Sequence, residues 1–453
     1  MSMNSRFLIS VCLIVTLFSC SSPAKGLREH HVAVTGSDTR GKGTPQKPWK
    51  TIAFAVSKIQ GGDVVTIHRG IYRENYIKIL PSASGSGETP TTIRAANGEE
   101  VTIHAVDRQN KDPYAIGVID ASHVVIEGLK VIGYSRRAKG GKGGTLYIGG
   151  SKEPCTGVKI RHCELINSGT KLGASNPSIV VFNYTENCEI SNCKVYGSEK
   201  CDRTGIKIWS GTSKLLVQGN EVFNLLRKGI DNKHGGRDKH LIIRNNYVHD
   251  VGHMGIHLNG DKSVVENNVL YRCRIGIGVW RNEGGPGGSH SILNHNTLVN
   301  CGAGIILGFG MAQEFRNCTV TNNIILNCSG EFPELSITPY RKTPLDFGHT
   351  IDYNCYFNYR NSGVIRYGKR RPFTLTEWKK LPKHDVHSVQ RDPGLLGEPD
   401  TFKDLCDFRV SERTAQSFET SDERIIGADI QKMKACPRRL LPSPSNVRIS
   451  TPE

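Results

Sequence analysis

The chain has 453 residues and a formal net charge of +17, from 59 Lys and Arg against 42 Asp and Glu. Its length allows two or three ordinary domains or one long solenoid, so length alone excludes neither architecture. The charge favours a polyanionic partner over a neutral or cationic one, and the alternative is a basic surface that serves only solubility.

The first residues read as an export signal. Arg6 precedes an apolar run over residues 7–18 that is too short for a membrane span. The run ends in residues 17–20 (LFSC), which resemble the lipobox of bacterial lipoproteins, whose cysteine becomes the lipidated first residue of the mature chain. Ordinary cleavage after Ala24 is the alternative. We therefore expect residues 1–24 to be a signal and Cys20 to anchor the protein to the outer membrane, in the periplasm or outside the cell.

Export also bears on the partner. Nucleic acid is the usual partner of a basic chain, but an exported protein meets acidic polysaccharide instead. We expect an acidic polysaccharide as partner, no nucleic acid, no membrane contact beyond the lipid anchor, and a monomer.

Short motifs mark residues 27–113 and the C-terminal region. The opening motifs are residues 32–38 (VAVTGSD), 43–45 (GTP), 48–52 (PWKTI), 61–65 (GGDVV) and 70–74 (GIYRE). They resemble the opening block of bacterial exported pectate-lyase-like β-helix proteins, in which a short helix after the PWKTI-type step caps the solenoid. Ile52, Val56 and Ile59 give this helix one apolar face. Residues 352–354 (DYN), 387–389 (HSV) and 407–409 (DFR) resemble the C-terminal wrap of the same family.

Two ladders with one period lie within residues 114–330. A Gly-Ile step recurs at spacings of 24, 26, 21 and 28 residues, and an asparagine recurs just before an apolar residue. The Gly-Ile steps begin at Gly205, Gly229, Gly255, Gly276 and Gly304, and the asparagines are Asn220, Asn246, Asn268, Asn296 and Asn323. Segments 145–148 and 178–182 continue the pattern less regularly. The runs between these residues are β-rich and only a few residues long, so they predict strands that pair in parallel with the next coil.

These observations predict an all-β fold, a single-stranded right-handed parallel β-helix with a short N-terminal capping helix and a C-terminal wrap. We expect the cap and first coils in 27–113, the β-helix core in 114–330, further coils and the wrap in 331–440, and a disordered tail in 441–453. The asparagines are expected to hydrogen-bond one another at a bend. Cys163 and Cys193 fall at the same repeat position, so we expect free buried thiols there and not a disulfide, although exported chains rich in cysteine usually form them.

The resemblance implies an activity only broadly, because the family includes polysaccharide lyases, glycoside hydrolases, epimerases and proteins of unknown activity. Strand parity offers candidate residues instead. In each Gly-Ile step the Ile faces inward, so the next residue and the one two later face solvent. These outward residues are Lys207 and Trp209, Asp231 and Lys233, His257 and Asn259, and Gly278 and Trp280, with Arg281 directly after them.

This combination of basic, acidic and aromatic side chains suits β-elimination from a uronate, which needs a neutralised carboxylate and a base above the C5 proton. Arg281, or a calcium ion bound by Asp231, is expected to neutralise the carboxylate. Lys233 or His257 is the expected base, and the crowding of Lys207 with Lys233 and Arg281 lowers a lysine pKa. Trp209, Trp280 and Asn259 are expected to bind the sugar.

Three alternatives stay open. A hydrolase on the same fold would use Asp231 and Glu283 as its carboxylate pair. A non-catalytic protein would use the basic stripe only to bind glycans, and an ordinary cross-strand charge ladder would have no function. If the predicted site is wrong, the outward residues of earlier coils, such as Tyr147 and Phe182, are the next candidates.

Overall fold

The computed structural model describes most of the chain. The described residues are 28–105, 114–133, 144–167, 178–198, 204–209, 211–232, 240–279, 288–308, 316–330, 332–338, 348–381, 384–398, 401–402, 404–422 and 424–433. In this part of the chain no helix is long and apolar enough to cross a membrane.

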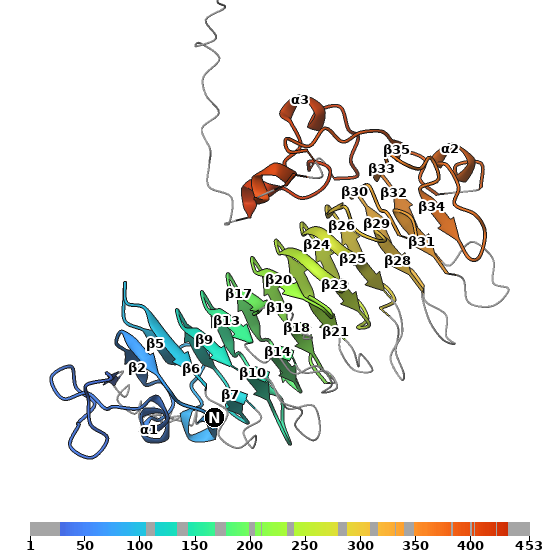
Figure 1. Cartoon of the computed structure of the whole chain (residues 1–453). Coiled ribbons are helices and arrows are strands. Elements are labelled where there is room, and N and C mark those ends of the chain that lie inside the picture. Colours follow the sequence, from blue (N-terminus) through green and yellow to red (C-terminus); the bar gives the residue numbers. More distant parts are fainter. Residues whose placement is uncertain are drawn as a thin grey trace, which may run out of the picture.

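The chain forms a right-handed parallel β-helix, as the repeats predicted. Each full coil contributes one short strand to each of three faces, and every strand pairs in parallel with the corresponding strands of the neighbouring coils (Figure 1). In the coil around residue 220, for example, the chain passes from the first face at 216–218 to the second at 221–225 and the third at 230–232. The solenoid begins before residue 114 and continues beyond 330, because the parallel pairs start at Glu29 and end at Gln390.

The described strands of the three faces have the following bounds. The first face consists of β1 (Glu29–Val32), β2 (Val64–Ile67), β5 (Thr91–Ala95), β8 (Val124–Glu127), β12 (Lys159–Arg161), β16 (Glu189–Ser191), β19 (Leu216–Gln218), β22 (Ile242–Arg244), β24 (Val264–Glu266), β26 (Ile292–Asn294), β29 (Thr319–Thr321) and β32 (Thr350–Asp352). The second face consists of β3 (Gly70–Tyr72), β6 (Val101–His104), β9 (Lys130–Gly133), β13 (Glu164–Asn167), β17 (Lys194–Gly197), β20 (Glu221–Leu225), β27 (Thr297–Val299), β30 (Ile324–Leu326), β33 (Cys355–Phe357) and β35 (Val389–Gln390). The third face consists of β4 (Ile77–Ile79), β7 (Tyr114–Ile119), β10 (Gly144–Gly149), β14 (Ser178–Asn183), β18 (Thr204–Ile208), β21 (Ile230–Asn232), β28 (Ile305–Leu307), β31 (Leu335–Ile337) and β34 (Ile365–Tyr367).

Two long strands, β23 (Tyr247–Leu258) and β25 (Val269–Val279), run through both the second and the third face. Their pairing shifts register between Val251 and Met254, where β23 turns the corner. A short pair, β11 (Cys155–Thr156) with β15 (Thr185–Glu186), lies outside the three faces.

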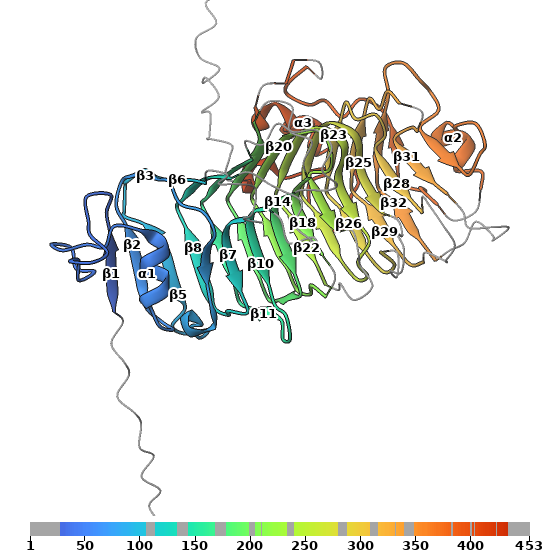
Figure 2. The ribbon, with the colours of Figure 1, turned by 60° about the horizontal axis from the view of Figure 1, so that its bottom comes forward.

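Short helices close the ends of the solenoid. The predicted capping helix is α1 (Ile52–Lys58), which packs against β4 at the N-terminal end and buries Ile52 and Val56 (Figure 2). Thr51 caps it, and the Glu74 carboxylate accepts from the backbone N–H groups of its first turn. The remaining helices are α2 (Leu375–Trp378), α3 (Glu412–Ala415) and the 3₁₀ turns Pro81–Ala83, Leu405–Phe408 and Ile430–Lys432.

The asparagine ladder sits at the bend between the first and second faces. The Oδ1 atom of Asn246 accepts from both the backbone N–H and the side-chain amide of Asn220, each at 3.0 Å. Asn246 in turn donates its amide to Asn268 at 2.9 Å, and the same pattern continues to Asn354. These fully buried amides satisfy one another and the bend backbone, which is the structural role that the repeat predicted.

Cys163 and Cys193 continue this ladder toward the N-terminus as free, buried thiols. The backbone N–H of Cys163 donates to the Cys193 sulfur at 3.4 Å, and that of Cys193 donates to Asn220 Oδ1 at 3.0 Å. The prediction for both residues is therefore confirmed. Cys406 differs, because it is disulfide-bonded, and spacing alone did not reveal this bond.

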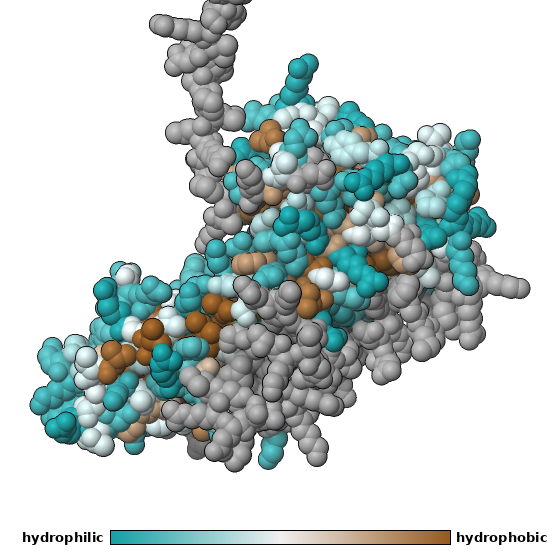
Figure 3. Space-filling view, in the orientation of Figure 1, coloured by the Kyte–Doolittle hydropathy of each residue, from teal (hydrophilic) through white to brown (hydrophobic). Residues whose placement is uncertain are grey.

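The C-terminal segment returns along the outside of the second face (Figure 1). Phe402, Leu405 and Phe408 pack there against Tyr247 and Tyr271. The side of the segment turned outward is mainly hydrophilic (Figure 3). This wrap covers the apolar residues of the second face in the C-terminal half of the solenoid, so that face is largely closed to a large ligand there.

Candidate functional site

Three predicted residues form one row on the third face. Lys207 of β18 lies in register with Asp231 of β21, and Asp231 lies in register with His257 of β23. Their neighbours Ile206, Ile208 and Ile256 belong to the core, so the row points away from the coil interior. The prediction that these side chains share one face on consecutive strands is confirmed.

The row is not exposed to solvent, however, and this part of the prediction is wrong. The exposed fractions of Lys207, Asp231 and His257 are 2%, 4% and 0%. The alternation of side chains along a strand predicts whether a side chain points into or out of its own coil. It does not predict whether the outer face is covered. Ionisable groups are rarely buried this deeply unless other charges and hydrogen bonds compensate them.

A fourth residue, Lys228, provides that compensation. Its ammonium group donates to Asp231 Oδ1 at 2.8 Å and lies 2.9 Å from His257 Nδ1. His257 Nδ1 is 2.7 Å from the same oxygen. We assign the Nδ1 proton of His257 to this shorter hydrogen bond, which leaves Nε2 with the lone pair. A carboxylate that orients an imidazole in this way is a common arrangement behind a general base.

The electrostatics of the cluster set its protonation state. Burial alone would raise the pKa of Asp231, but the hydrogen bond from His257 and the positive charge of Lys228 hold it well below its ordinary range. Burial lowers the pKa of His257 to about 4, and the charge of Lys228 acts in the same direction against the hydrogen bond to Asp231. At neutral pH the cluster therefore holds an ionised carboxylate beside a neutral imidazole.

Asn232 and Asn259 support the row from the side. Asn232 is fully buried at the inward position where the neighbouring coil has Ile208, as parity predicted. Its Oδ1 accepts from the backbone N–H of Asn259 at 3.0 Å, so this amide fixes the chain directly after His257. Asn259 is itself fully buried, which makes it a support for the strand end. Its predicted contact with substrate stays a prediction.

The N-terminal continuation of the row is aromatic. Lys207 places its ammonium group 3.9 Å from the ring centroid of the half-buried Trp209. Tyr147 lies two strands before Lys207 in the same row and stacks on Tyr114 with ring centroids 5.6 Å apart. Phe182 does not belong to this row, which corrects its assignment as an outward residue. It pairs with Ile208 and is fully buried in the core, because its coil lacks the Gly-Ile step that sets parity elsewhere.

Several predicted site residues lie outside the described residues. These are Cys20, Lys233, Trp280, Arg281 and Glu283. The described residues contain no group of three or more His, Cys, Asp or Glu side chains suited to a metal ion. Asp231, the expected calcium ligand, accepts hydrogen bonds from the Lys228 ammonium group and the His257 imidazole, an environment of donors that fits an anion better than a cation.

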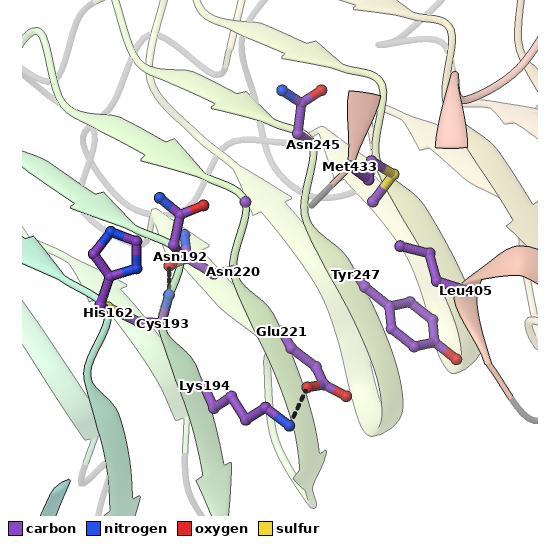
Figure 4. A pocket seen from close by; sticks show the side chains of 11 residues that line it. His162, Asn192, Cys193, Lys194, Asn220, Glu221, Asn245, Tyr247, Leu405 and Met433 are labelled. Carbon is purple, nitrogen blue, oxygen red and sulfur yellow. Dashed lines mark hydrogen bonds and ion pairs between the residues drawn. The ribbon is translucent and has the colours of Figure 1, made fainter. Parts of the chain in front are cut away.

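A separate hollow of about 230 Å³ lies at the bend between the first and second faces (Figure 4). Its wall includes Tyr247 and the wrap residues Leu405 and Met433. Its charged groups Lys194 and Glu221 pair with each other at 3.1 Å, and Asn220 is engaged in the asparagine ladder. The ion pair of the hollow is partly exposed, whereas the ionisable groups of the third-face row are buried, so the row is the better candidate for chemistry.

Lys228 is the residue that sequence reasoning missed. It precedes the Gly229-Ile230 step, where parity along the strand does not apply. Its spacing of three residues from Asp231 was a usable signal, since a long side chain at a corner can reach forward over the next strand.

Comparisons with known proteins agree with the fold. Residues 178–364 match the family model for the right-handed β-helix region. The uncharacterized protein YwoF of Bacillus subtilis (strain 168) is 23% identical over 435 residues, which cover 81% of this chain and 88% of that protein.

Solved structures resemble the chain at low sequence identity. A complex of XylC with xylose has a TM-score of 0.55 at 14% identity, covering 81% of this chain and 87% of that one. Pectate lyase Pel9A has a TM-score of 0.49 at 14% identity, covering 71% and 82%. The solved structures with this fold also include a rhamnogalacturonan lyase and a glycoside hydrolase. At these identities the likeness establishes the parallel β-helix and nothing finer.

Proposed function

We propose that this protein is an exported carbohydrate-active enzyme, a lyase that cleaves an acidic, uronate-containing polysaccharide by β-elimination. The observation that carries the proposal is the row of Lys207, Asp231 and His257 on consecutive strands, joined by Lys228. A merely structural ladder of surface charges would be hydrated, whereas this one is buried and holds a neutral imidazole beside a carboxylate.

In the proposed reaction, a uronate displaces what covers the buried row, and His257 Nε2 removes its C5 proton. The electron pair of that C–H bond forms a C4=C5 double bond, the bond from C4 to the glycosidic oxygen breaks, and the leaving oxygen takes up a proton. Asp231 holds the imidazole through Nδ1–H and stabilises the imidazolium that forms. Lys207 lies one strand from Asp231 and two strands from His257, and its positive charge offsets the charge that develops on the substrate carboxylate.

Two further features support a glycan as the substrate. The net charge of +17 favours a polyanion, and the half-buried Trp209 offers an aromatic ring beside Lys207. The similar XylC structure was solved with a sugar, xylose. Attachment to the outer membrane through Cys20 is part of the same proposal, since it would place the enzyme where such polymers are met.

The test is an incubation of the purified mature protein with pectate, alginate, ulvan and glycosaminoglycans. Ultraviolet absorbance would follow the unsaturated ends that elimination creates, and a reducing-end assay would follow every cleavage. We expect both signals to rise together on at least one acidic polymer. Reducing ends without absorbance would show a hydrolase, and retention without turnover would show a glycan-binding protein, so either result would overturn the proposal.

A further inference from the structure

The C-terminal wrap binds to the solenoid through side chains at the bend between the first and second faces. Asn322 accepts a hydrogen bond from the backbone N–H of Ser421 at 3.0 Å. Asn267 accepts from the backbone N–H of Asp429 and donates its amide to the carbonyl oxygen of the same residue. Both bend residues directly precede a member of the asparagine ladder. We call the positions directly before the ladder, including those before Cys163 and Cys193, the outer bend row.

The wrap advances along the outer bend row by four residues per coil, toward the N-terminal end of the solenoid. The neighbours in order are Asn322 with Ser421, His295 with Ile425, Asn267 with Asp429, and Asn245 with Met433. The first three pairs are hydrogen-bonded, and the last two residues line the hollow together. Met433 is the last described residue, and twenty residues of the chain follow it. At the same step, Pro437 would lie at Gly219 and Leu441 at Asn192.

Beyond Met433 the outer bend row continues along the wall of the hollow (Figure 4). Its next positions are Gly219, Asn192 and His162, which have the same left-handed backbone conformation as the row residues that bind the wrap. Among the described residues, the side chains of Asn192 and His162 have no hydrogen-bond partner. The hollow therefore offers a further stretch of wrap the kind of groups that bind the preceding stretch.

The sequence after the last described residue fits these positions. Pro437 has no backbone N–H to donate, and Gly219 has no side chain to accept a hydrogen bond. Leu441 has both a backbone N–H and a carbonyl group, and the Asn192 amide can bind both, as the amides farther along the row do. Tyr247 adds an apolar wall to the hollow. The unpartnered groups of the row and of the following segment are therefore complementary, coil by coil.

The disulfide of Cys406 points to the same segment. Every other cysteine in the described part of the chain is free. The cysteines outside that part are Cys12, Cys20, Cys201 and Cys436. The first two belong to the expected export signal, and Cys201 falls between β17 and β18, at the opposite edge of the second face. Cys436 follows Met433 by three residues, a reach of at most about 11 Å. Cys406 adjoins Leu405, which lines the hollow with Met433, and their two 3₁₀ turns are in contact.

We propose that the hollow is the docking site of this chain's own residues 434–441, held there by a disulfide between Cys406 and Cys436. The docked segment extends the wrap over two more coils and ends one residue beyond the boundary expected from the sequence. The bond forms when the two thiols lose two electrons and two protons to a disulfide oxidant of an oxidising compartment. The docking does not depend on the proposed enzyme, because the catalytic row lies on the third face.

Peptide mapping tests the disulfide. The full mature chain is denatured without reductant, its free thiols are alkylated, and it is cleaved with trypsin. We expect residues 404–409 to be recovered bound to residues 435–438, and reductant to separate the two peptides. Recovery of residues 404–409 bound to the peptide that contains Cys201, or with an alkylated Cys406, would contradict the proposal.

Hydrogen–deuterium exchange tests the docking itself. Mass spectrometry follows residues 434–442 in the folded protein and in a free synthetic peptide of the same sequence. We expect exchange in the folded protein to be slower by about tenfold or more, because docked N–H groups are protected from water. Asn192→Gly should make this exchange about threefold to tenfold faster, the effect of losing one hydrogen bond. Glycine suits the left-handed φ of this position, so we expect the variant to fold.

Asn187→Gly is the matched control and should leave the exchange unchanged. Asn187 belongs to the same coil, lies at the other end of β16, is exposed, and also has a left-handed φ. Cys436→Ser should remove most of the protection, because the segment loses its tether. Equal effects of the two glycine substitutions, or exchange in the wild type as fast as in the free peptide, would overturn the docking. Protection that increases with protein concentration would place the segment of a second copy in the hollow, which also contradicts the proposal.

Discussion

Asp231 shows how much chemistry depends on a single buried carboxylate. One of its oxygens lies within 2.8 Å of Lys228 Nζ and 2.7 Å of His257 Nδ1, and it is almost fully buried. Parity predicted that Asp231 and His257 are neighbours because they occupy equal positions in adjacent repeats. It could not predict Lys228, whose side chain reaches forward from a corner, nor the burial of the row.

Replacing the base and its orienting partner tests this arrangement. We expect His257→Gln and Asp231→Asn each to lower turnover on the acidic polymer by about two orders of magnitude or more, because general base catalysis and its orientation are lost. KM should change much less. Steady-state kinetics with circular dichroism as a folding control would measure this. Equal activity in His257→Gln and wild type would remove His257 as the base.

The pH dependence of the reaction gives a second test. A histidine of ordinary pKa would lose activity as the pH falls through about 6.5. The lowered pKa of His257, about 4, keeps the imidazole neutral and able to accept a proton down to that value. We therefore expect kcat/KM to stay level from pH 7 to pH 5 and to fall only near pH 4. An acidic limb near pH 6.5 would contradict the described environment of His257.

The raised pKa of Glu334 predicts that the free energy of unfolding depends on pH. It takes the position of the repeating glycine, before β31, and burial raises its pKa from 4.5 to about 7. Its Oε1 accepts from Cys328 N–H and the Asn358 amide. A raised pKa means that the buried acid stabilises the fold fully below about pH 4.5 and that this contribution is lost as the pH rises through 7.

We expect Glu334→Gln to remove this loss, because an amide oxygen keeps both hydrogen bonds without a buried charge. Above pH 7 the free energy of unfolding of the variant should exceed that of the wild type by about 1–3 kcal/mol, and near pH 4.5 the two should be alike. Thermal or denaturant unfolding at both pH values measures the difference. A constant difference between the two proteins across this range would show that Glu334 does not titrate as described.

At the scale of elements, the ladders explain why the fold could be predicted from the sequence. A buried side-chain amide needs hydrogen-bond partners, and in this ladder the next coil supplies them by placing another amide at the same position. Asn220, Asn246 and Asn268 therefore report the coil register directly. The coil containing Phe182 has no Gly-Ile step, and strand parity therefore gave the wrong direction for that side chain. The length of β23 and β25 was also hidden, since their corner is formed by a register shift with no sequence marker.

The ladder can be broken at one rung. We expect Asn246→Ala to lower the free energy of unfolding by about 2–4 kcal/mol, since it leaves the buried N–H groups of Asn220 without their acceptor and opens a small cavity. Asn361→Ala, at an exposed position, is the control and should change stability by less than about 0.5 kcal/mol. Denaturant unfolding compares them. Equal effects of the two substitutions would show that the ladder does not stabilise the coil bend.

At the scale of the whole molecule, the family resemblance predicted the caps as well as the coils. The capping helix α1 forms as expected, because Ile52 and Val56 lie together on its buried face. The C-terminal wrap was also expected, but its contact with the second face was not, because Phe402 and Phe408 lie far in sequence from Tyr247 and Tyr271. That contact covers the second face, and we place the substrate on the third face because the row of Lys207, Asp231 and His257 lies there.

The proposed anchor can be tested on the whole protein. We expect the wild type, expressed in a Gram-negative cell, to fractionate with the outer membrane and to incorporate labelled palmitate. Cys20→Ala should abolish the labelling, because the thiol that carries the lipid is gone. The variant chain should then either be released from the outer membrane or stay uncleaved. Soluble, unlabelled wild-type protein cleaved after Ala24 would contradict the lipid anchor without affecting the proposed enzyme.

The mass of the cleavage products tests the central claim most directly. β-Elimination yields a new non-reducing end that is lighter than a hydrolysis product by one water, because the C4=C5 double bond replaces the added water. We predict that mass spectrometry of an acidic oligosaccharide treated with wild-type protein shows these unsaturated products, and that His257→Gln yields almost none. Saturated products of full mass, or intact substrate with every acidic glycan, would contradict the account.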